Sequence, residues 1–452
     1  MTPPTHDPGP EIDTSIRTSG IVLEPGIPIC QADLPLDWYQ QEFMPYAEEY
    51  LELPDRKPET VLPWMDAYIR PALEELGPTL MLLAHYYMGG EIVKLVERYG
   101  GHVADSYELA RQAVSHPEKK LFVESAVHFM AEAISLLAHP DQEVYITNPK
   151  SGCTMEMMAK EFMVAPAFER LQARYGDDLV VVAYMNTSGR LKALAGRTGG
   201  AVCTSANASV ILRWVRSQGR RILFVPDEHL GRNAAAQVGI PEDRIYVWPG
   251  AHAGAERAAV DFSREEQKQL DQAEMILWGS FCGVHTVFDP EQITYWRDRG
   301  YGVVVHPECP KEVVEQADSA GSTSYLWNHV MQAPPGSCFA VATEAHFVRN
   351  LAEQAARIGT TVTHLADLPA SGQAEGACGC ATMSRNDPPH LVAMVDLLRK
   401  GQAPEVNRVL PGDMVDEISG SRERLDPGSR AELTRNARLA LERMIDITEA
   451  AR

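Results

Sequence analysis

The sequence has few cysteines, fewer basic than acidic residues and no long hydrophobic run. Eight cysteines among 452 residues are too few for a disulfide framework. No apolar stretch reaches the ~20 residues that a membrane-spanning helix needs, so we expect no membrane partner. Lys and Arg number 41 against 62 Asp and Glu, and the net charge of −21 should repel nucleic-acid phosphates. We therefore expect a globular protein without a nucleic-acid partner.

The first residues, MTPPTHDPGPEID, also lack the basic and apolar regions of a secretory signal. We therefore expect a cytoplasmic protein. In a reducing compartment the informative cysteines are metal ligands or nucleophiles.

Three segments repeat one pattern, in which an apolar strand-like run ends in a polar cluster and leads into a helical pattern. The polar clusters fall at His85, Tyr184 and His306. Strands that alternate with helices at this spacing predict βαβ units with parallel sheets, whose ligands bind beyond the carboxyl ends of the strands. We therefore predict an α/β protein of three similar αβα domains, with short parallel sheets in a pseudo-threefold arrangement around a central cluster site.

The repeats also set the predicted domain boundaries. The predicted parts are an N-terminal extension (1–77), a first repeat (78–175), a second repeat (176–298) with an insert near 251–275, a third repeat (299–400) and a C-terminal helical segment (401–452).

Each repeat next places a hydroxyl residue where a helix should begin. These residues are Ser106, Ser205 and the pair Ser322 and Thr323. The backbone N–H groups and the dipole at a helix N-terminus favour anions. The pattern therefore predicts that these positions bind carboxylate or phosphate groups.

Each repeat ends with a cysteine in a glycine-containing turn: Cys153, Cys282 and Cys380. Buried cysteines are often only small hydrophobic residues, but the shared context favours ligands. Structural zinc sites prefer four ligands and usually close Cys-x-x-Cys pairs, which the sequence lacks. Three cysteines could hold a [4Fe–4S] cluster and leave one iron open as a Lewis acid.

Twelve ordered motifs resemble the quinolinate synthase family over residues 78–400: LAHYY, ADSYELA, VHFMAE, SGC, AYMNTS, VCTSANA, PDEHLG, FCGVH, HPECP, GSTS, TEAH and CATMSRN. The resemblance implies one [4Fe–4S] cluster with three cysteine ligands. It implies an enzyme of NAD biosynthesis, a transferase that condenses iminoaspartate with dihydroxyacetone phosphate to quinolinate, phosphate and water, with the open iron as Lewis acid. It also implies an aspartate oxidase or dehydrogenase as the source of iminoaspartate.

The resemblance assigns roles residue by residue. The implied cluster ligands are Cys153, Cys282 and Cys380, with Cys380 preferred to Cys378 because a Met and an Asn follow it at the family's spacing. The implied catalytic residues are Tyr87, Tyr184, His285 and Glu308. The implied substrate-binding residues are His85, Ser106, Tyr184, Asn186, Ser205, His306, Glu308, Ser322 and Thr323.

Some positions depart from the family pattern, and they keep alternatives open. Tyr86 and Met88 replace the residues that the family usually has beside the first polar cluster. His252 follows the segment WPGA, close to where the family pattern has a cysteine after Trp-Pro-Gly. We interpret His252 as part of the insert; the alternative is an extra ligand. The alternative functions are a divergent member that makes a related pyridine carboxylate, a non-catalytic iron–sulfur sensor, and a zinc-dependent hydrolase that uses His285 or His306.

Overall fold

The computed structural model describes residues 36–368, 379–416 and 420–451. Cys378 therefore lies outside the described residues. The chain divides into two compact units, which are described separately. The first unit comprises the chain up to residue 151 with 379–410 and 415–422, and the second comprises 152–378, 411–414 and 423–452.

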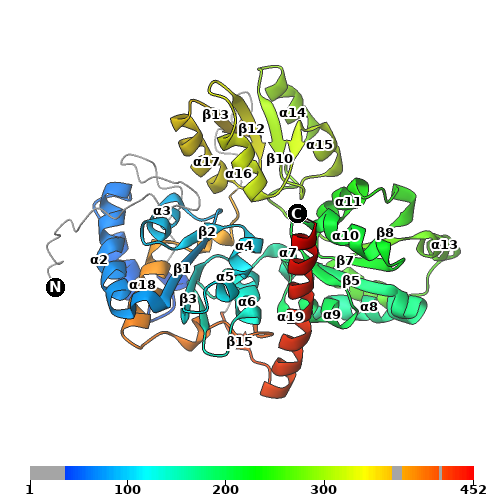
Figure 1. The fold of residues 1–452 in the computed structure, drawn as a ribbon, viewed down its shortest axis with the longest axis horizontal. Helices are drawn as coiled ribbons and strands as arrows, with labels where there is room; N and C mark the ends of the chain where they lie inside the picture. The colour runs from blue at the N-terminus through cyan, green and yellow to red at the C-terminus, as the bar shows by residue number, and fades with distance from the viewer. Residues whose placement is uncertain (1–35, 369–378, 417–419, 452) are drawn as a thin grey trace. The chain divides into compact units, whose positions relative to one another are not determined.

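The first unit holds a four-stranded parallel sheet in the order β2-β1-β3-β4, flanked by helices (Figure 1). Its strands are β1 (Leu80–His85), β2 (His102–Ala104), β3 (Leu121–Ser125) and β4 (Glu143–Ile146). Its helices are α1 (Met44–Leu51), α2 (Pro58–Leu76), α3 (Gly90–Arg98), α4 (Ser106–Ala110), α5 (Gln112–Ser115), α6 (His128–Leu137) and α18 (Pro388–Arg399). Every residue of β1 is buried, as a continuous apolar run in a covered parallel sheet requires.

The second unit holds two parallel sheets. The first, in the order β6-β5-β7-β9-β8, contains β5 (Leu179–Tyr184), β6 (Ala201–Cys203), β7 (Arg221–Val225), β8 (Ile245–Pro249) and β9 (Met275–Gly279). The second, in the order β11-β10-β12-β13, contains β10 (Gly302–Val305), β11 (Ser319–Ala320), β12 (Cys338–Ala342) and β13 (Thr361–His364).

Helices connect these strands. Those associated with the five-stranded sheet are α7 (Thr154–Met157), α8 (Glu161–Tyr175), α9 (Gly189–Arg197), α10 (Ala208–Ser217), α11 (Glu228–Gln237), α12 (Ala251–Ala258) and α13 (Arg264–Gln272). Those of the four-stranded sheet are α14 (Pro290–Arg297), α15 (Lys311–Gln316), α16 (Thr323–Met331) and α17 (Ala345–Arg357). The predicted α/β class with repeated, short parallel sheets is confirmed. The pseudo-threefold arrangement stays a prediction.

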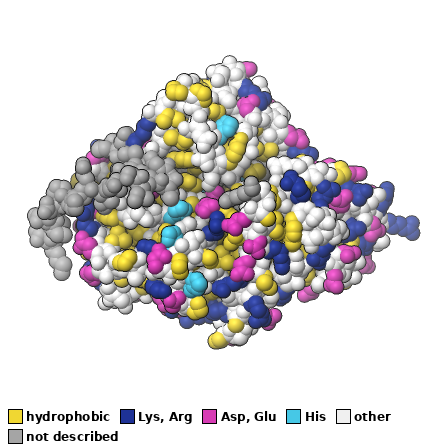
Figure 2. Space-filling view, viewed as in Figure 1, with side chains coloured by type: hydrophobic (Ala, Val, Ile, Leu, Met, Phe, Trp, Pro, Cys, Tyr) yellow, Lys and Arg dark blue, Asp and Glu magenta, His cyan; other side chains and the backbone are white. Residues whose placement is uncertain are grey.

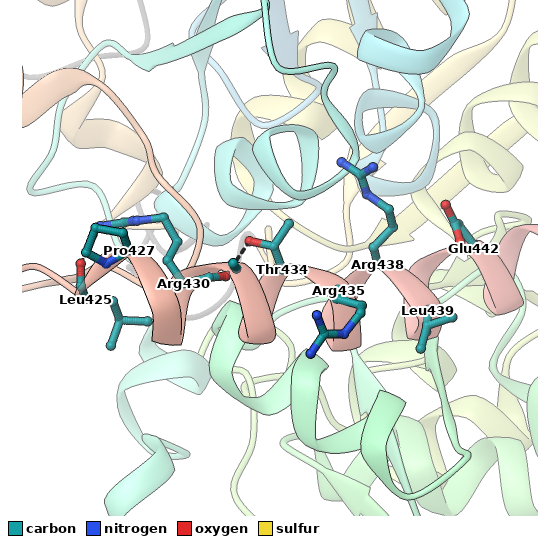
Figure 3. Close-up of a pocket in the computed structure, with 9 residues that line it drawn as sticks. Leu425, Pro427, Arg430, Thr434, Arg435, Arg438, Leu439 and Glu442 are labelled. Atoms are coloured by element: carbon teal, nitrogen blue, oxygen red, sulfur yellow. Dashed lines mark hydrogen bonds between the residues drawn. The ribbon is translucent and has the colours of Figure 1, made fainter.

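The long C-terminal helix α19 (Pro427–Ala450) packs on α9. Gly196 of α9 permits this contact, because a Cβ atom there would lie 1.9 Å from the carbonyl oxygen of Asn436. Another face of α19 borders a hollow of about 610 Å³ (Figure 3), where Thr434 donates to the carbonyl of Arg430. The Arg430 guanidinium pairs with Asp413 at 2.8 Å. None of the predicted site residues lines this hollow.

The visible surface mixes both signs of charge, with Lys and Arg side chains interspersed among Asp and Glu (Figure 2). Among the described helices, none combines the length and the apolar character needed to cross a bilayer.

Glu124 is a carboxyl residue inside an apolar core of the first unit. It lies in β3, is fully buried, and neither carboxylate oxygen has a hydrogen-bond partner among the described residues. Its neighbours on the adjacent strands are Leu83 and Ile146. Burial raises the pKa of Glu124 well above its ordinary value. The folded protein therefore holds this carboxyl group protonated.

Glu124→Gln should change the pH dependence of stability. Above the unfolded pKa of about 4.5, the unfolded chain loses a proton that the folded chain keeps, so the stability of the wild type falls as the pH rises. The free energy of unfolding should fall by about 1.4 kcal/mol per pH unit until the pKa of Glu124 in the folded state is reached. This decrease should be missing from the variant. Denaturant unfolding from about pH 5 to about pH 8 measures it, with the exposed Glu74→Gln as control. Equal slopes in the wild type and Glu124→Gln would contradict the assignment.

Candidate functional site

Polar side chains of the second unit meet at the carboxyl ends of its parallel strands. Tyr184 is the last residue of β5, and Glu308 follows β10 within HPECP. The Tyr184 hydroxyl donates to Oε1 of Glu308, and both residues are buried. The sequence predicted that each of these residues lies at a strand end, and the structure joins them by a hydrogen bond.

His285 brings a third group to this cluster. Its Nδ1 lies 2.8 Å from Oε2 of Glu308. Its ring stacks on His306 with centroids 4.6 Å apart. Its Nε2 lies 3.1 Å from the hydroxyl oxygen of Thr343. Thr343, which follows β12 in the TEAH motif, fixes the orientation of His285 and was not predicted.

Two buried carboxyl groups near this cluster have pKa values displaced in opposite directions. Burial acts to raise the pKa of Glu308, but the His285 contact, the charge of His306 and the Tyr184 bond outweigh it and lower that pKa to about 2. Burial and then the charge of Glu308 raise the pKa of Asp227 well above its ordinary value. Neighbouring buried carboxylates do not both ionise. These opposite shifts favour the ionised form of Glu308 and the protonated form of Asp227.

Asp227 also connects this cluster to a predicted ligand. It ends the β7 strand-to-helix turn and caps α11, accepting from the backbone N–H of Leu230 at 2.7 Å. Its other oxygen accepts from the backbone N–H of Cys282 at 3.2 Å. The residue lies in the PDEHLG motif, but no role was predicted for it.

Cys282 lies in the loop after β9 and is half-buried. Cys282, His285 and Glu308 each offer one possible ligand atom, and these three atoms lie within 4.8 Å of one another. A thiolate, an imidazole and a carboxylate can together hold a metal ion. This is the metal-binding group that the described residues of the second unit offer.

The other two predicted cysteine ligands are also half-buried. Sγ of Cys153 lies 4.0 Å from the amide nitrogen of Asn186, so two predicted site residues of the second unit are neighbours. In the first unit, Sγ of Cys380 lies 3.3 Å from the hydroxyl oxygen of Thr382. At both cysteines a polar group therefore lies close to the sulfur atom.

Asn386 fixes the loop that carries Cys380. Its amide nitrogen donates to the Ala126 carbonyl and to the Ser151 hydroxyl, at 2.8 and 2.7 Å. Ser151 in turn donates to the carbonyl of Thr382 at 2.8 Å. The Asn at this spacing after Cys380 was part of the motif, and the structure shows that it ties the cysteine loop to the end of the first unit's sheet.

Two further cysteines of the second unit have a different environment. Cys203 and Cys309 are fully buried, and burial raises the pKa of both thiols. They are therefore poor thiolate ligands. His252 lies in α12 beside Phe162, with ring centroids 6.3 Å apart, and is not part of the metal-binding group found among the described residues.

A cavity of about 210 Å³ in the second unit brings Ser205 and Ser322 together. Ser205 precedes α10, and Ser322 caps α16 by accepting from the backbone N–H of Tyr325. Thr323 begins α16 and is buried but does not line this cavity. Two helix N-termini therefore border one small polar cavity, as an anion site requires.

The first unit positions the remaining predicted residues. His85 ends β1 and is buried, and its Nδ1 accepts from the backbone N–H of Tyr87 at 3.2 Å. The ring of Tyr87 is perpendicular to that of His85, with centroids 4.6 Å apart. Ser106 begins α4, but Asp105 is the residue that caps this helix. Tyr86, the departure from the family pattern, is buried against His85.

Comparisons with known proteins agree on one family. A sequence model of the quinolinate synthetase A protein family matches residues 69–425. The quinolinate synthase of Corynebacterium glutamicum is 37% identical over 387 residues, covering 85% of this chain and 87% of that protein. That of Streptomyces coelicolor is 36% identical over 410 residues (90% and 94%), and that of Geobacillus kaustophilus 35% over 377 residues (83% and 96%). The family match contains every predicted site residue.

Proposed function

We propose that this chain, which belongs to the quinolinate synthetase A protein family, condenses iminoaspartate with dihydroxyacetone phosphate to quinolinate, phosphate and water, as a step of NAD biosynthesis. The observation that carries the proposal is the buried cluster of Tyr184, His285 and Glu308 beside the half-buried Cys282. A buried acid–base cluster next to a candidate metal ligand fits a reaction that moves several protons and eliminates water.

Glu308 is the proton acceptor of the proposed mechanism. Its carboxylate is held ionised by His285 and Tyr184, so it can accept a proton from a carbon or nitrogen of the condensing substrates. Tyr184 and His285, in contact with it, can donate protons to leaving hydroxyl groups. His306 stacks on His285 and holds that ring in place.

The cavity between Ser205 and Ser322 is the proposed phosphate site. Its lining contains no Lys or Arg among the described residues, so hydroxyls and helix N-termini must provide the binding. A volume of about 210 Å³ fits a group the size of a triose phosphate. Neutral donors suit a phosphate that must depart during the reaction, because they hold it without a full counter-charge.

We propose that Cys153, Cys282 and Cys380 hold one [4Fe–4S] cluster. The residues present fit such a group, because all three thiols are half-buried, and Asn186 and Thr382 lie within reach of the sulfur atoms of Cys153 and Cys380. When bound, such a cluster supplies one open iron as a Lewis acid for hydroxyl or carboxylate groups.

We assign the first unit's Tyr87 to proton transfer, and its His85 and Ser106 to substrate binding. The contact between His85 and the backbone of Tyr87 supports this pairing, since it fixes both side chains at the end of β1. In the second unit, Asn186 and Thr323 complete the proposed substrate-binding set.

The function is tested by an anaerobic assay of the iron–sulfur-reconstituted protein. Dihydroxyacetone phosphate and iminoaspartate, freshly generated by an aspartate oxidase, are the substrates, and quinolinate is identified by chromatography and mass. Catalytic turnover to quinolinate is the expected result. A protein with an intact cluster that makes another pyridine carboxylate, or no product, would contradict the proposal in favour of the divergent enzyme or the sensor.

Ser205→Ala should raise the KM for dihydroxyacetone phosphate by about tenfold, because a hydrogen bond to a charged group is lost. The kcat should change little, since Ser205 lies away from the Glu308 cluster in the proposed mechanism. Steady-state kinetics measure both constants, with the exposed Ser115→Ala as control. If only the KM for iminoaspartate rose, this cavity would not be the phosphate site.

The zinc-dependent hydrolase remains a second candidate, and one observation favours it. Cys282, His285 and Glu308 provide three donors of types that bind zinc, within 4.8 Å of one another. In that case Glu308 would be a metal ligand rather than the proton acceptor.

A further inference from the structure

A further cavity of about 550 Å³ lies in the second unit, lined by residues of α10 and α13 and by residues at or just before the starts of β7, β8 and β9. Its basic residues are Arg213, Arg216, Arg220, Arg221 and Arg244. Its acidic residues are Asp271 and Glu274, so the lining has an excess of three positive charges. The chain as a whole has a net charge of −21, so the charge of this cavity is opposite in sign to that of the molecule.

The cavity lies at the opposite sheet edge from the proposed catalytic cluster. Arg221 is the first residue of β7, and Arg244 and Glu274 directly precede β8 and β9. Because these strands are parallel, their amino ends share one edge of the sheet. Tyr184 ends β5 at the other edge. The cavity is therefore distinct from the Ser205 cavity, although α10 contributes to both.

Backbone carbonyls hold two of the guanidinium groups in place. Arg220 donates to the carbonyls of Asp177 and Thr198, and Arg221 donates to those of Asp271 and Ala273. A carbonyl group orients a guanidinium without cancelling its charge. These two side chains are therefore positioned cations rather than partners in neutral ion pairs.

The remaining arginines are only partly neutralised. Glu274 is shared by Arg216 and Arg244, at 3.2 and 3.4 Å. Asp271 is paired with Arg174 from outside the lining. Within the part of the chain that the structure describes, Arg213 makes no hydrogen bond or ion pair. Its guanidinium is available to a ligand.

A sixth guanidinium group lies near Arg220. Arg443 of α19 donates to the carbonyl of Gly200. Burial and then the charge of Arg220 lower the pKa of Arg443. Arg443 therefore lies close enough to Arg220 for the two positive charges to repel each other.

We propose that this arginine cavity binds a small compound with a diphosphate group. Guanidinium groups match phosphate oxygens bidentately, which makes arginine the preferred residue for phosphate recognition. The volume of about 550 Å³ is that of a small-molecule site and leaves room for a nucleoside beyond the phosphates. A protein partner would need a larger surface, of about 800 Å² on this side.

The test is isothermal titration of the full chain with pyrophosphate and with adenosine 5′-diphosphate, at about 0.15 M salt so that unspecific attraction is screened. Saturable binding of one equivalent is expected. Tighter binding of the nucleotide would place its nucleoside in the cavity, and equal binding would mean that the diphosphate alone is recognised. Both results support the site.

The variants separate this site from the other anion cavity. Arg213→Gln and Arg244→Gln should each weaken binding about tenfold. Arg299→Gln, at an exposed arginine in the turn after α14, should not. Thermal unfolding midpoints confirm that the variants fold. The proposal would be overturned if neither phosphate compound bound saturably. It would also be overturned if Arg299→Gln weakened binding as much as the cavity variants, or if Ser205→Ala abolished binding and the cavity variants did not. Binding of a hexaglutamate peptide in place of both phosphate compounds would overturn it too, and would indicate an acidic protein partner.

Discussion

Cys282→Ala is expected to lose both the visible absorbance of the cluster and all formation of quinolinate. Cys282 is half-buried, and its backbone N–H is fixed by Asp227, so the thiol is presented at one place in the loop after β9. A cluster that takes only three protein ligands should not survive the loss of one of them. Visible absorbance, iron content and anaerobic turnover, measured on one preparation, provide the readout.

Cys338→Ser is the matched control for this variant. Cys338 is also half-exposed and lies in the same unit, at the start of β12, but it is not among the proposed ligands. It should keep the full cluster and full turnover. Retention of colour and activity by Cys282→Ala would remove Cys282 from the ligand set, and loss of both by Cys338→Ser would show that the readout reports general instability.

Glu308→Gln is expected to lower kcat by about 100- to 10,000-fold while the cluster spectrum is kept. The amide can still receive the Tyr184 hydrogen bond, so the packing of the buried cluster is preserved. It cannot accept a proton, and it removes the negative charge that His285 contacts. The loss should therefore fall on kcat rather than on the KM for either substrate.

Glu312→Gln supplies the control, because Glu312 is exposed on α15 only four residues away. It should leave kcat unchanged. If Glu308→Gln instead lost the cluster, Glu308 would act as a metal ligand and the proposed proton acceptor would have to be another residue. A kcat equal to that of the wild type would remove Glu308 from the mechanism.

The repeated α/β fold could be predicted because its signals are local. Runs such as LVVVAY are apolar up to a final polar residue, as is typical of buried parallel strands. The structure places β5 on these residues. Strand order could not be predicted in the same way. β9 lies between β7 and β8, although it follows β8 in the chain. That order depends on tertiary packing of the insert, which forms α12 and α13.

The candidate site was predictable where a residue type implies its chemistry. Tyr184 and Glu308 were visible as polar residues after apolar runs, and the structure joins them. Asp227 and Thr343 were not predicted, because their roles depend on contacts with Cys282 and His285 from other segments. The arginine cavity was missed for a similar reason. Its residues come from several separate segments and form no motif in the sequence.

The central claim is that the half-buried cysteines hold an iron–sulfur cluster, and metal analysis tests it most directly. Protein purified without oxygen should contain about four iron atoms and four acid-labile sulfides per chain, and no stoichiometric zinc. One zinc per chain without sulfide would contradict this account. It would assign Cys282, His285 and Glu308 to a mononuclear site instead.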